Sequence, residues 1–123
     1  MNLLVVDDEV IQLMSLKRGL KNLGHEVIPF TRAEAAIDFL MDGSKKIDIL
    51  LTDYSMPGMN GMELIKKVRS TDKTLPIIIM TAYGEKELIL EALRHRCDGY
   101  LNKPFSLENL EQEIERVEKN NER

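Results

Sequence analysis

The chain has one cysteine, no hydrophobic run long enough to cross a bilayer and no concentrated block of basic residues. A disulfide or a cysteine zinc site needs more than one thiol, so Cys97 forms neither within this chain and is expected to be a small buried residue. The first residues do not have the charged-then-apolar pattern of a leader segment, so none is expected. The absence of a membrane-spanning run and of a leader pattern predicts a soluble cytoplasmic protein without membrane contact.

Charge and length narrow the classes of function further. The 123 residues carry a net charge of -4, and the charged residues are spread along the chain, so direct nucleic-acid binding is not expected. With 43% hydrophobic residues, a chain of this length buries one compact core. We therefore expect one domain over residues 1–118, with residues 119–123 as a frayed end or the start of a linker.

Short apolar runs alternate with longer stretches that have helical spacing. The first, third and fourth runs are apolar at nearly every position, as in parallel strands buried on both faces. Five such β-then-α units predict an α/β fold, a parallel sheet with helices on both faces. The predicted strands are Leu3–Val6, Glu26–Phe30, Ile47–Thr52, Pro76–Met80 and Gly99–Leu101.

Helix boundaries carry signals as well. Apolar residues between positions 11 and 23 recur at three- and four-residue steps, which predicts a first helix with an apolar stripe. A polar N-cap residue followed three residues later by Glu has the spacing of a capping box, and Gly favours a helix end. The predicted boundary residues are Thr31 with Glu34, Asn60 with Glu63, Ser106 for the last helix, and Gly24 at the end of the first.

Polar side chains follow the predicted strands at their carboxyl ends, the edge at which parallel α/β sheets bind ligands. Asp7 and Asp8 follow the first strand, and Asp53 follows the third. Thr81 follows the fourth strand and Lys103 the fifth. The pattern predicts that three carboxylates, one hydroxyl and one ammonium group meet at a single edge.

Each of these residues has an ordinary structural explanation when it is taken alone. Asp8 or Glu9 favours the first turn of a helix through the helix dipole, and Asp53 suits a turn. Lys103 and Thr81 fit a solvated loop and a strand end. Their joint placement is what favours a common site.

The predicted cluster of acids needs positive charge to offset it. At about 4 Å, two like charges near a protein surface repel by roughly 4 kcal/mol. The three aspartates carry three negative charges, Lys103 offsets one, and a divalent cation offsets the other two. Oxygen ligands without nearby histidine or cysteine favour Mg²⁺ or Mn²⁺. Beside such a metal, Asp53 can act as a nucleophile and form an aspartyl phosphate.

Four motifs resemble the receiver domains of two-component response regulators, and the likeness covers essentially the whole chain. They are VVDDE at residues 5–9, LLTDYSMPGMNG at 50–61, the TA of MTAY at 81–82 and KPF at 103–105. The resemblance implies a doubly wound, flavodoxin-like sheet of five strands in the order 2-1-3-4-5, with five helices. It also implies a cis peptide bond between Lys103 and Pro104.

The resemblance further implies a role for each residue of the cluster. Asp53 looks like the phosphoacceptor. Asp8 and Asp53 would bind Mg²⁺, with the backbone carbonyl of Ser55 as a further ligand. Asp7 would help through a water molecule or from behind the direct ligands. Lys103 would pair with Asp53 and with the phosphoryl group.

Other positions would carry or tune the response. Thr81 would sense phosphorylation, and Tyr100 would rotate inward as Thr81 moves. Ser55 and Tyr83 occupy positions that tune hydrolysis of the phosphate in this family. We expect the bulky Tyr83 to shield the acyl phosphate partly from water.

The chain departs from the family where its fourth helix ends. Arg96 and Cys97 stand where relatives often have a small Gly-Ala pair, and Arg tolerates a left-handed cap less well than Gly. A strained or remodelled helix end is therefore expected. His25 and His95 are interpreted as solvated surface residues and not as phosphate donors.

The expected function is a phosphorylation-driven switch and not an enzyme. A histidine kinase or histidine phosphotransfer protein would phosphorylate Asp53, and the face made by the fourth helix, fifth strand and fifth helix would change. The resemblance adds homodimerisation through that face. The chain is either a freestanding regulator or a module of a larger protein such as a hybrid kinase.

Three other functions share parts of the pattern. Aspartyl-phosphate phosphatases also use a strand-end Asp with Mg²⁺, but they need a second Asp at the position that Ser55 occupies. A flavodoxin-like cofactor binder needs a phosphate-cradling first loop, whereas VVDDE repels phosphate unless a metal intervenes. A degenerate receiver that acts as a scaffold is disfavoured by the complete set of acids, hydroxyl and lysine.

Overall fold

Five parallel strands form one sheet in the order β2-β1-β3-β4-β5, which confirms the expected topology. The computed structural model describes residues 1–82 and 85–121. Strands β1, β3 and β4 lie in the interior of the sheet, and β2 and β5 form its edges. The strands are β1 (Asn2–Val6), β2 (Glu26–Phe30), β3 (Ile49–Asp53), β4 (Ile77–Ala82) and β5 (Gly99–Lys103).

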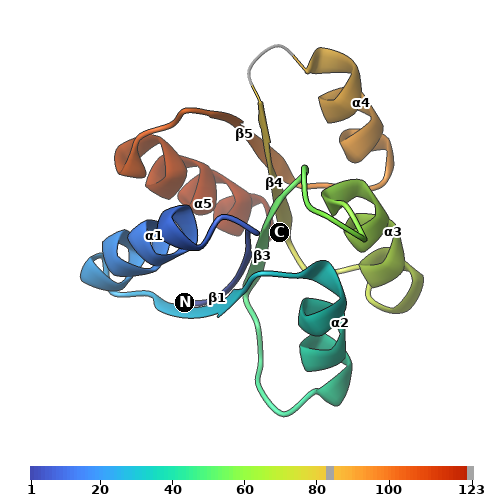
Figure 1. Cartoon of the computed structure of the whole chain (residues 1–123), viewed down its shortest axis with the longest axis horizontal. Helices are drawn as coiled ribbons and strands as arrows, with labels where there is room; N and C mark the ends of the chain where they lie inside the picture. The colour runs from blue at the N-terminus through green and yellow to red at the C-terminus, as the bar shows by residue number, and fades with distance from the viewer. Residues whose placement is uncertain (83–84, 122–123) are drawn as a thin grey trace.

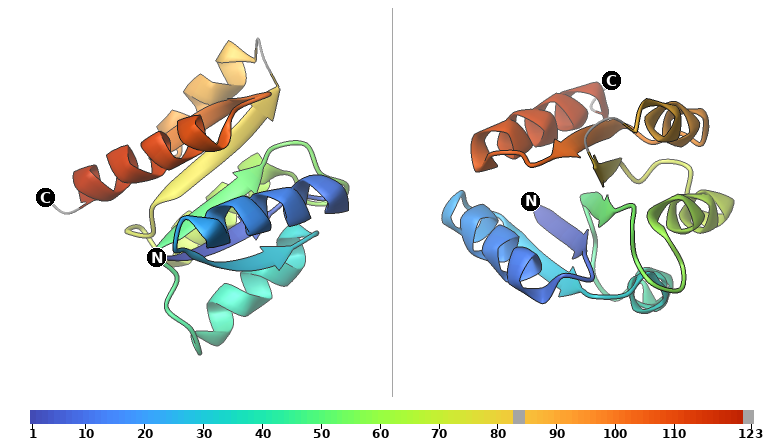
Figure 2. Two further views of the ribbon diagram at one scale, coloured as in Figure 1. Left: turned by 90° about the vertical axis from the view of Figure 1, so that its left-hand side faces the viewer. Right: turned by 45° about the horizontal axis from the view of Figure 1, so that its top comes forward.

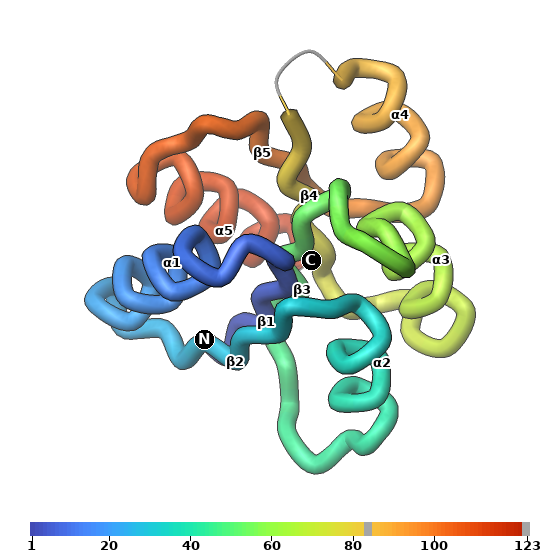
Figure 3. The backbone as a smooth tube through the Cα atoms, viewed as in Figure 1, coloured from blue at the N-terminus to red at the C-terminus, as the bar shows by residue number. Residues whose placement is uncertain are grey.

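Helices cover both faces of this sheet. Figure 1 shows α1 and α5 together on one side, with α2, α3 and α4 on the other. The two turned views in Figure 2 and the backbone trace in Figure 3 show the same three-layer arrangement. The helices are α1 (Val10–Asn22), α2 (Ala33–Asp42), α3 (Gly61–Thr71), α4 (Lys86–Arg94) and α5 (Leu107–Asn121).

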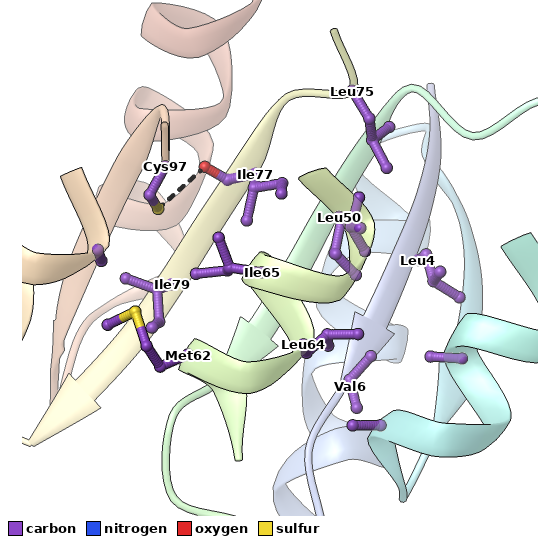
Figure 4. Packing of buried hydrophobic residues seen from close by; sticks show 14 of the residues in the cluster. Leu4, Val6, Leu50, Met62, Leu64, Ile65, Leu75, Ile77, Ile79 and Cys97 are labelled. Atoms are coloured by element: carbon purple, nitrogen blue, oxygen red, sulfur yellow. Dashed lines mark hydrogen bonds between the residues drawn. The ribbon is translucent and has the colours of Figure 1, made fainter. Parts of the chain in front are cut away.

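A separate hydrophobic core lies on each face of the sheet. Alternate residues of β1, β3 and β4 point into opposite cores, so nearly every side chain of these strands is buried. Part of the core against α2, α3 and α4 is drawn in Figure 4. On the other face the strands pack against Leu13 and Leu20 of α1 and against Leu110 and Ile114 of α5. The continuous apolar runs of the sequence follow from this two-sided burial.

Three strands extend farther toward their carboxyl ends than the sequence predicts. Asp53 is the last residue of β3, Thr81 lies within β4, and Lys103 is the last residue of β5. The ladder continues this far because Asp53 pairs with Met80 and Thr81 pairs with Asn102. The sheet therefore fixes the backbone of these polar residues, which the sequence placed just beyond the strands.

One of the two predicted capping boxes is confirmed and the other is wrong. Asn60 accepts a hydrogen bond from the backbone N–H of Glu63, and Glu63 accepts one from the backbone of Asn60. Thr31 does not cap α2, because the chain stays extended through Arg32, which is the N-cap without a side-chain bond. Glu34 instead lies 3.5 Å from the guanidinium of Arg32.

The other two boundary signals are confirmed. The hydroxyl of Ser106 accepts a hydrogen bond from the backbone N–H of Asn109 at 3.0 Å, as expected of an N-cap residue. Gly24 has a φ of 95°, which an L side chain rarely adopts. This turn brings the N–H of His25 to the carbonyl of Leu20 and ends α1.

The apolar stripe of α1 is only partly buried. Leu13, Leu16 and Leu20 pack into the core, whereas Ile11 is 87% exposed and Met14 is 42% exposed. One side of the helix contacts the sheet and α5, and these two residues lie outside that contact.

At the other end of the chain, α5 continues to Asn121, past the boundary placed at residue 118. Residues 122–123 lie outside the described residues, so that boundary stays a prediction. Within the described residues, none of the helices combines the length and the apolar character that a membrane crossing requires.

The end of α4 is strained at the predicted position. Arg96 has a φ of 66°, in the left-handed region that favours glycine. The guanidinium of Arg69 donates to the carbonyl of Arg96 at 2.7 Å and pairs with Asp98 at 3.0 Å, which holds this turn against α3. Cys97 is buried as expected, and its thiol contacts the carbonyl of Ile77 (Figure 4).

The interpretation of His25 as a solvated residue is wrong. Its side chain is only 10% exposed, and Nε2 lies 2.9 Å from a carboxylate oxygen of Glu111 on α5. The turn after α1 packs against α5, and this contact between distant segments leaves no local trace in the sequence. His95 is partly exposed at the end of α4, as expected.

Candidate functional site

Three aspartates meet at the carboxyl edge of the sheet, as predicted. Carboxylate oxygens of Asp7, Asp8 and Asp53 lie within 4.8 Å of one another. Asp7 directly follows β1 and is fully buried, Asp53 ends β3 and is 5% exposed, and Asp8 is accessible to solvent. Because β1 and β3 are neighbours in the sheet, their ends necessarily bring these acids together.

Lys103 supplies the positive charge expected in this cluster. Its ammonium nitrogen lies 3.2 Å from Oδ1 of Asp53 and 3.4 Å from Oδ2 of Asp7. Gln12, on the first turn of α1, accepts a further hydrogen bond from the same nitrogen at 3.2 Å. The peptide bond between Lys103 and Pro104 is cis, which confirms that expectation.

The cluster remains short of positive charge. Burial raises the pKa of the Asp53 carboxyl, Lys103 opposes that rise, and the negative charges of Asp7 and Asp8 add to it. One ammonium group therefore does not balance the three carboxylates. A cation at this edge would remove the remaining repulsion.

The donor set fits Mg²⁺ or Mn²⁺. The three acids offer hard oxygen ligands from a rigid sheet edge, and the accessible Asp8 leaves one side open to water. Such ions commonly bind one or two carboxylates and keep several waters and room for a phosphate oxygen. The chemistry of the residues present is therefore that of a hard-cation site.

The backbone after Asp53 is fixed by close packing against the start of α3. Gly61 donates its N–H to the carbonyl of Tyr54 at 2.8 Å. A Cβ at position 61 would lie 2.5 Å from the carbonyl oxygen of Asp53, so only glycine fits there. This packing holds the turn that carries Ser55 and positions the carboxylate of Asp53.

The structure brings Thr81 to the same edge but gives its hydroxyl a partner. Thr81 is 1% exposed, and its Oγ1 donates to Oδ1 of Asn102 at 3.1 Å. Tyr100 precedes Asn102 by two residues on β5. It is 42% exposed, and its side chain lies at the surface of the molecule. The expectation that these residues respond to phosphorylation stays a prediction.

Of the two remaining predicted site residues, the structure describes Ser55. Ser55 is exposed in the turn after β3, where its carbonyl as a metal ligand stays a prediction. Tyr83, predicted to shield the acyl phosphate, lies outside the described residues.

Two contacts of the site were not predicted from the sequence. Gln12 is one of many polar residues on a helix, and its contact with Lys103 depends on where α1 docks. Asn102 gave a weak signal, because it is a polar residue in an apolar strand just before Lys103. Only the register of β4 against β5 shows that it faces Thr81.

Comparison with known proteins identifies the family of this chain. The model of the response regulator receiver domain family matches residues 3–115. The chain is 37% identical over 121 residues to the chemotaxis protein CheY homolog of Campylobacter jejuni, covering 95% of this chain and 92% of that protein. It is likewise 37% identical to chemotaxis protein CheY1 of Helicobacter pylori, covering 95% and 96%.

Solved structures show the same architecture. A response regulator receiver domain protein from Clostridium thermocellum matches with a TM-score of 0.92 and 25% identity, covering 98% of this chain and 96% of that one. The chain therefore belongs to the response regulator receiver domains, a family of phosphorylation-dependent signalling switches.

Proposed function

We propose that Asp53 is the phosphoacceptor of this switch and that Asp8 and Asp53 hold Mg²⁺ beside it. The backbone carbonyl of Ser55 is a further ligand. Asp7 contacts the ion through a water molecule or supports the residues that bind it directly. The observation that carries the proposal is the placement of Asp53. Asp53 is the last residue of an interior strand and lies 3.2 Å from Lys103, and it keeps a small exposed surface of 5% whereas Asp7 is fully buried.

The chemistry follows from these contacts. A carboxylate oxygen of Asp53 attacks the phosphorus of a phosphohistidine, the new P–O bond forms, and the P–N bond breaks to leave the imidazole on the donor. Lys103, already 3.2 Å from Asp53, stabilises negative charge on the transferring phosphoryl oxygens. Mg²⁺ held by Asp8 and Asp53 would supply further positive charge to those oxygens.

The donor proposed is a histidine kinase or a histidine phosphotransfer protein. The first turns of α1, which follow Asp8 directly, carry exposed apolar side chains at Val10, Ile11 and Met14. Exposed apolar groups beside an acceptor suit the docking of a protein donor. Small phosphodonors need no such surface.

The response proposed is a change of the face formed by α4, β5 and α5. A phosphoryl group carries roughly -1.5 to -2 charge in place of the single negative charge of the Asp53 carboxylate, and it brings strong acceptor oxygens. Thr81, on the strand beside Asp53, would turn its hydroxyl to one of these oxygens, and Tyr100 would move inward. Homodimerisation through this face belongs to the same proposal.

Mass spectrometry after incubation with acetyl phosphate and Mg²⁺ tests the assignment. The wild type should gain one labile phosphoryl group, and Asp53→Asn should gain none. Asp38→Asn is the matched control, because Asp38 is an exposed acid on α2, and this variant should be phosphorylated like the wild type. An adduct on Asp53→Asn, or steady hydrolysis of a phosphoester by the wild type, would contradict the proposal.

A further inference from the structure

The hydroxyl group of Thr81 already donates a hydrogen bond in this structure. Thr81 is 1% exposed, and Oγ1 donates its hydrogen to Oδ1 of Asn102 at 3.1 Å. A hydroxyl carries one hydrogen and can donate only one hydrogen bond at a time. While this bond exists, Thr81 cannot donate to a phosphoryl oxygen.

The sheet holds the two side chains opposite each other. Thr81 of β4 and Asn102 of β5 are register partners, so their side chains lie side by side on one face of the sheet. Strand pairing fixes both backbones at the carboxyl edge of the sheet. Figures 1 and 3 show β4 and β5 as neighbouring strands. Breaking the bond therefore needs a side-chain rotation and no change of register.

Asn102 also faces the surface that is proposed to change. Tyr100 and Asn102 are two residues apart on β5 and line the same groove against α5, together with Gln112. When Thr81 leaves Asn102, the amide of Asn102 loses a partner at the wall of this groove. The bond thus links the phosphorylation edge to the groove beside Tyr100.

We propose that Asn102 is a positioning residue that holds Thr81 in the unphosphorylated arrangement and competes with the phosphoryl group for its hydroxyl. The inference rests on the proposed function, because it assumes that Thr81 turns toward a group on Asp53. Asn102 lowers the apparent affinity for that group, and it sets how readily the site changes state.

Two variants remove the acceptor while keeping a side chain that suits a strand: Asn102→Leu, of similar shape, and Asn102→Val. The probe is beryllium trifluoride, an anion whose beryllium becomes tetrahedral when a carboxylate oxygen coordinates it and which then mimics a phosphoryl group. It is titrated in the presence of Mg²⁺ and followed by NMR. Loss of one competing hydrogen bond should tighten binding of the anion by about 2- to 10-fold. Gln112→Leu, in the same groove but without a contact to Thr81, should bind like the wild type.

A double-mutant cycle separates competition from general loosening of the strand. In a Thr81→Val background there is no hydroxyl to release, so Asn102→Leu should leave the affinity unchanged. The contact can also be measured without metal or anion, since Thr81→Val should shift the side-chain amide signals of Asn102 in the metal-free protein.

The outcomes are distinct. Equal or weaker binding by both Asn102 variants, or the same gain in the Thr81→Val background, overturns the competition while leaving the phosphoacceptor assignment in place. A wild type that binds no beryllium trifluoride and gains no phosphoryl group overturns the proposed function, and the competition with it.

Discussion

The ammonium nitrogen of Lys103 lies 3.2 Å from Oδ1 of Asp53 and joins the ends of β5 and β3, two strands that are not neighbours in the sheet. The side chain of Lys103 spans the end of β4 and reaches a carboxylate that is nearly buried. This contact partly offsets the negative charge of the acidic cluster. The repulsion that remains among the carboxylates should lower the stability of the metal-free protein.

Asp53→Asn should stabilise the metal-free protein at neutral pH. The pKa of Asp53 is raised by burial and by its acidic neighbours, so its ionised form costs folding free energy at pH values above that pKa. The free energy of unfolding in EDTA should rise by about 1 kcal/mol, or about 4 °C in Tm. The gain should shrink as the pH falls through the raised pKa toward that of an unfolded aspartate.

Thermal unfolding with and without Mg²⁺ checks this prediction. The wild type should gain stability from Mg²⁺, and Asp53→Asn should gain less. Asp38→Asn, an exposed acid on α2, should change neither value. A metal-free Asp53→Asn protein that is less stable than the wild type would show that the pair with Lys103 outweighs the repulsion.

Gly61→Ala should weaken both the fold and the cation site. The added Cβ would lie 2.5 Å from the carbonyl oxygen of Asp53 and 2.8 Å from the Cα of Tyr54, and both atoms belong to backbone. Such overpacking costs about 1–3 kcal/mol, which urea unfolding would measure. Mg²⁺ affinity should fall as the backbone of Asp53 shifts. In Gly19→Ala the Cβ meets only the flexible side chain of Leu107, so little change is expected.

Ile11→Lys should separate protein phosphodonors from small ones. Ile11 is 87% exposed at the start of α1, and a charge there would disrupt an apolar contact with a donor protein. Phosphotransfer from a histidine phosphotransfer protein should slow by about 10-fold, whereas phosphorylation by acetyl phosphate should not change. Met41→Lys alters an exposed apolar residue on α2 and serves as the control. Equal slowing with both donors would reject docking through this surface.

Arg96→Gly should stabilise the end of α4. Arg96 has a φ of 66°, and relief of the left-handed conformation should raise the free energy of unfolding by about 1 kcal/mol. The bond from Arg69 reaches the backbone carbonyl at this position, so it is kept in the variant. His95→Gly is the matched control: its φ is -92°, so glycine gains nothing there and should destabilise. Chemical denaturation of the pair distinguishes strain relief from a general effect of glycine.

The thiol of Cys97 should be inert in the folded protein. Burial raises its pKa to about 11, and the thiol is held against the carbonyls of Gly99 and Ile77. At pH 8, labelling by iodoacetamide should be about 100-fold slower than in urea, because the thiolate fraction falls with the raised pKa.

The raised pKa of the Cys97 thiol also makes the stability of the folded protein depend on pH. A raised pKa in the folded state means that protonation of the thiol favours folding, a contribution that is full below about pH 9 and lost as the pH rises through about 11. The stability difference between the wild type and Cys97→Ala should therefore narrow over this range. A constant difference would contradict a buried thiol.

Local patterns in the sequence were enough to predict the sheet, its burial on both faces and the cluster of acids at one edge. Apolar runs and helical spacing are local patterns, and parallel strands bring their carboxyl ends to a common edge whatever the details of packing. The meeting of Asp7, Asp53 and Lys103 could therefore be predicted from the sequence alone. The strained cap at Arg96 was also predictable, because a left-handed position depends on a single residue.

The partners of the polar side chains could not be predicted from the sequence, because they depend on the packing of distant segments. The bond between Thr81 and Asn102 depends on strand register, and the contact of His25 with Glu111 depends on how α5 docks against the turn after α1. Hydrogen bonds act over about 3 Å, so their partners are fixed by the packing of distant segments and not by spacing along the chain.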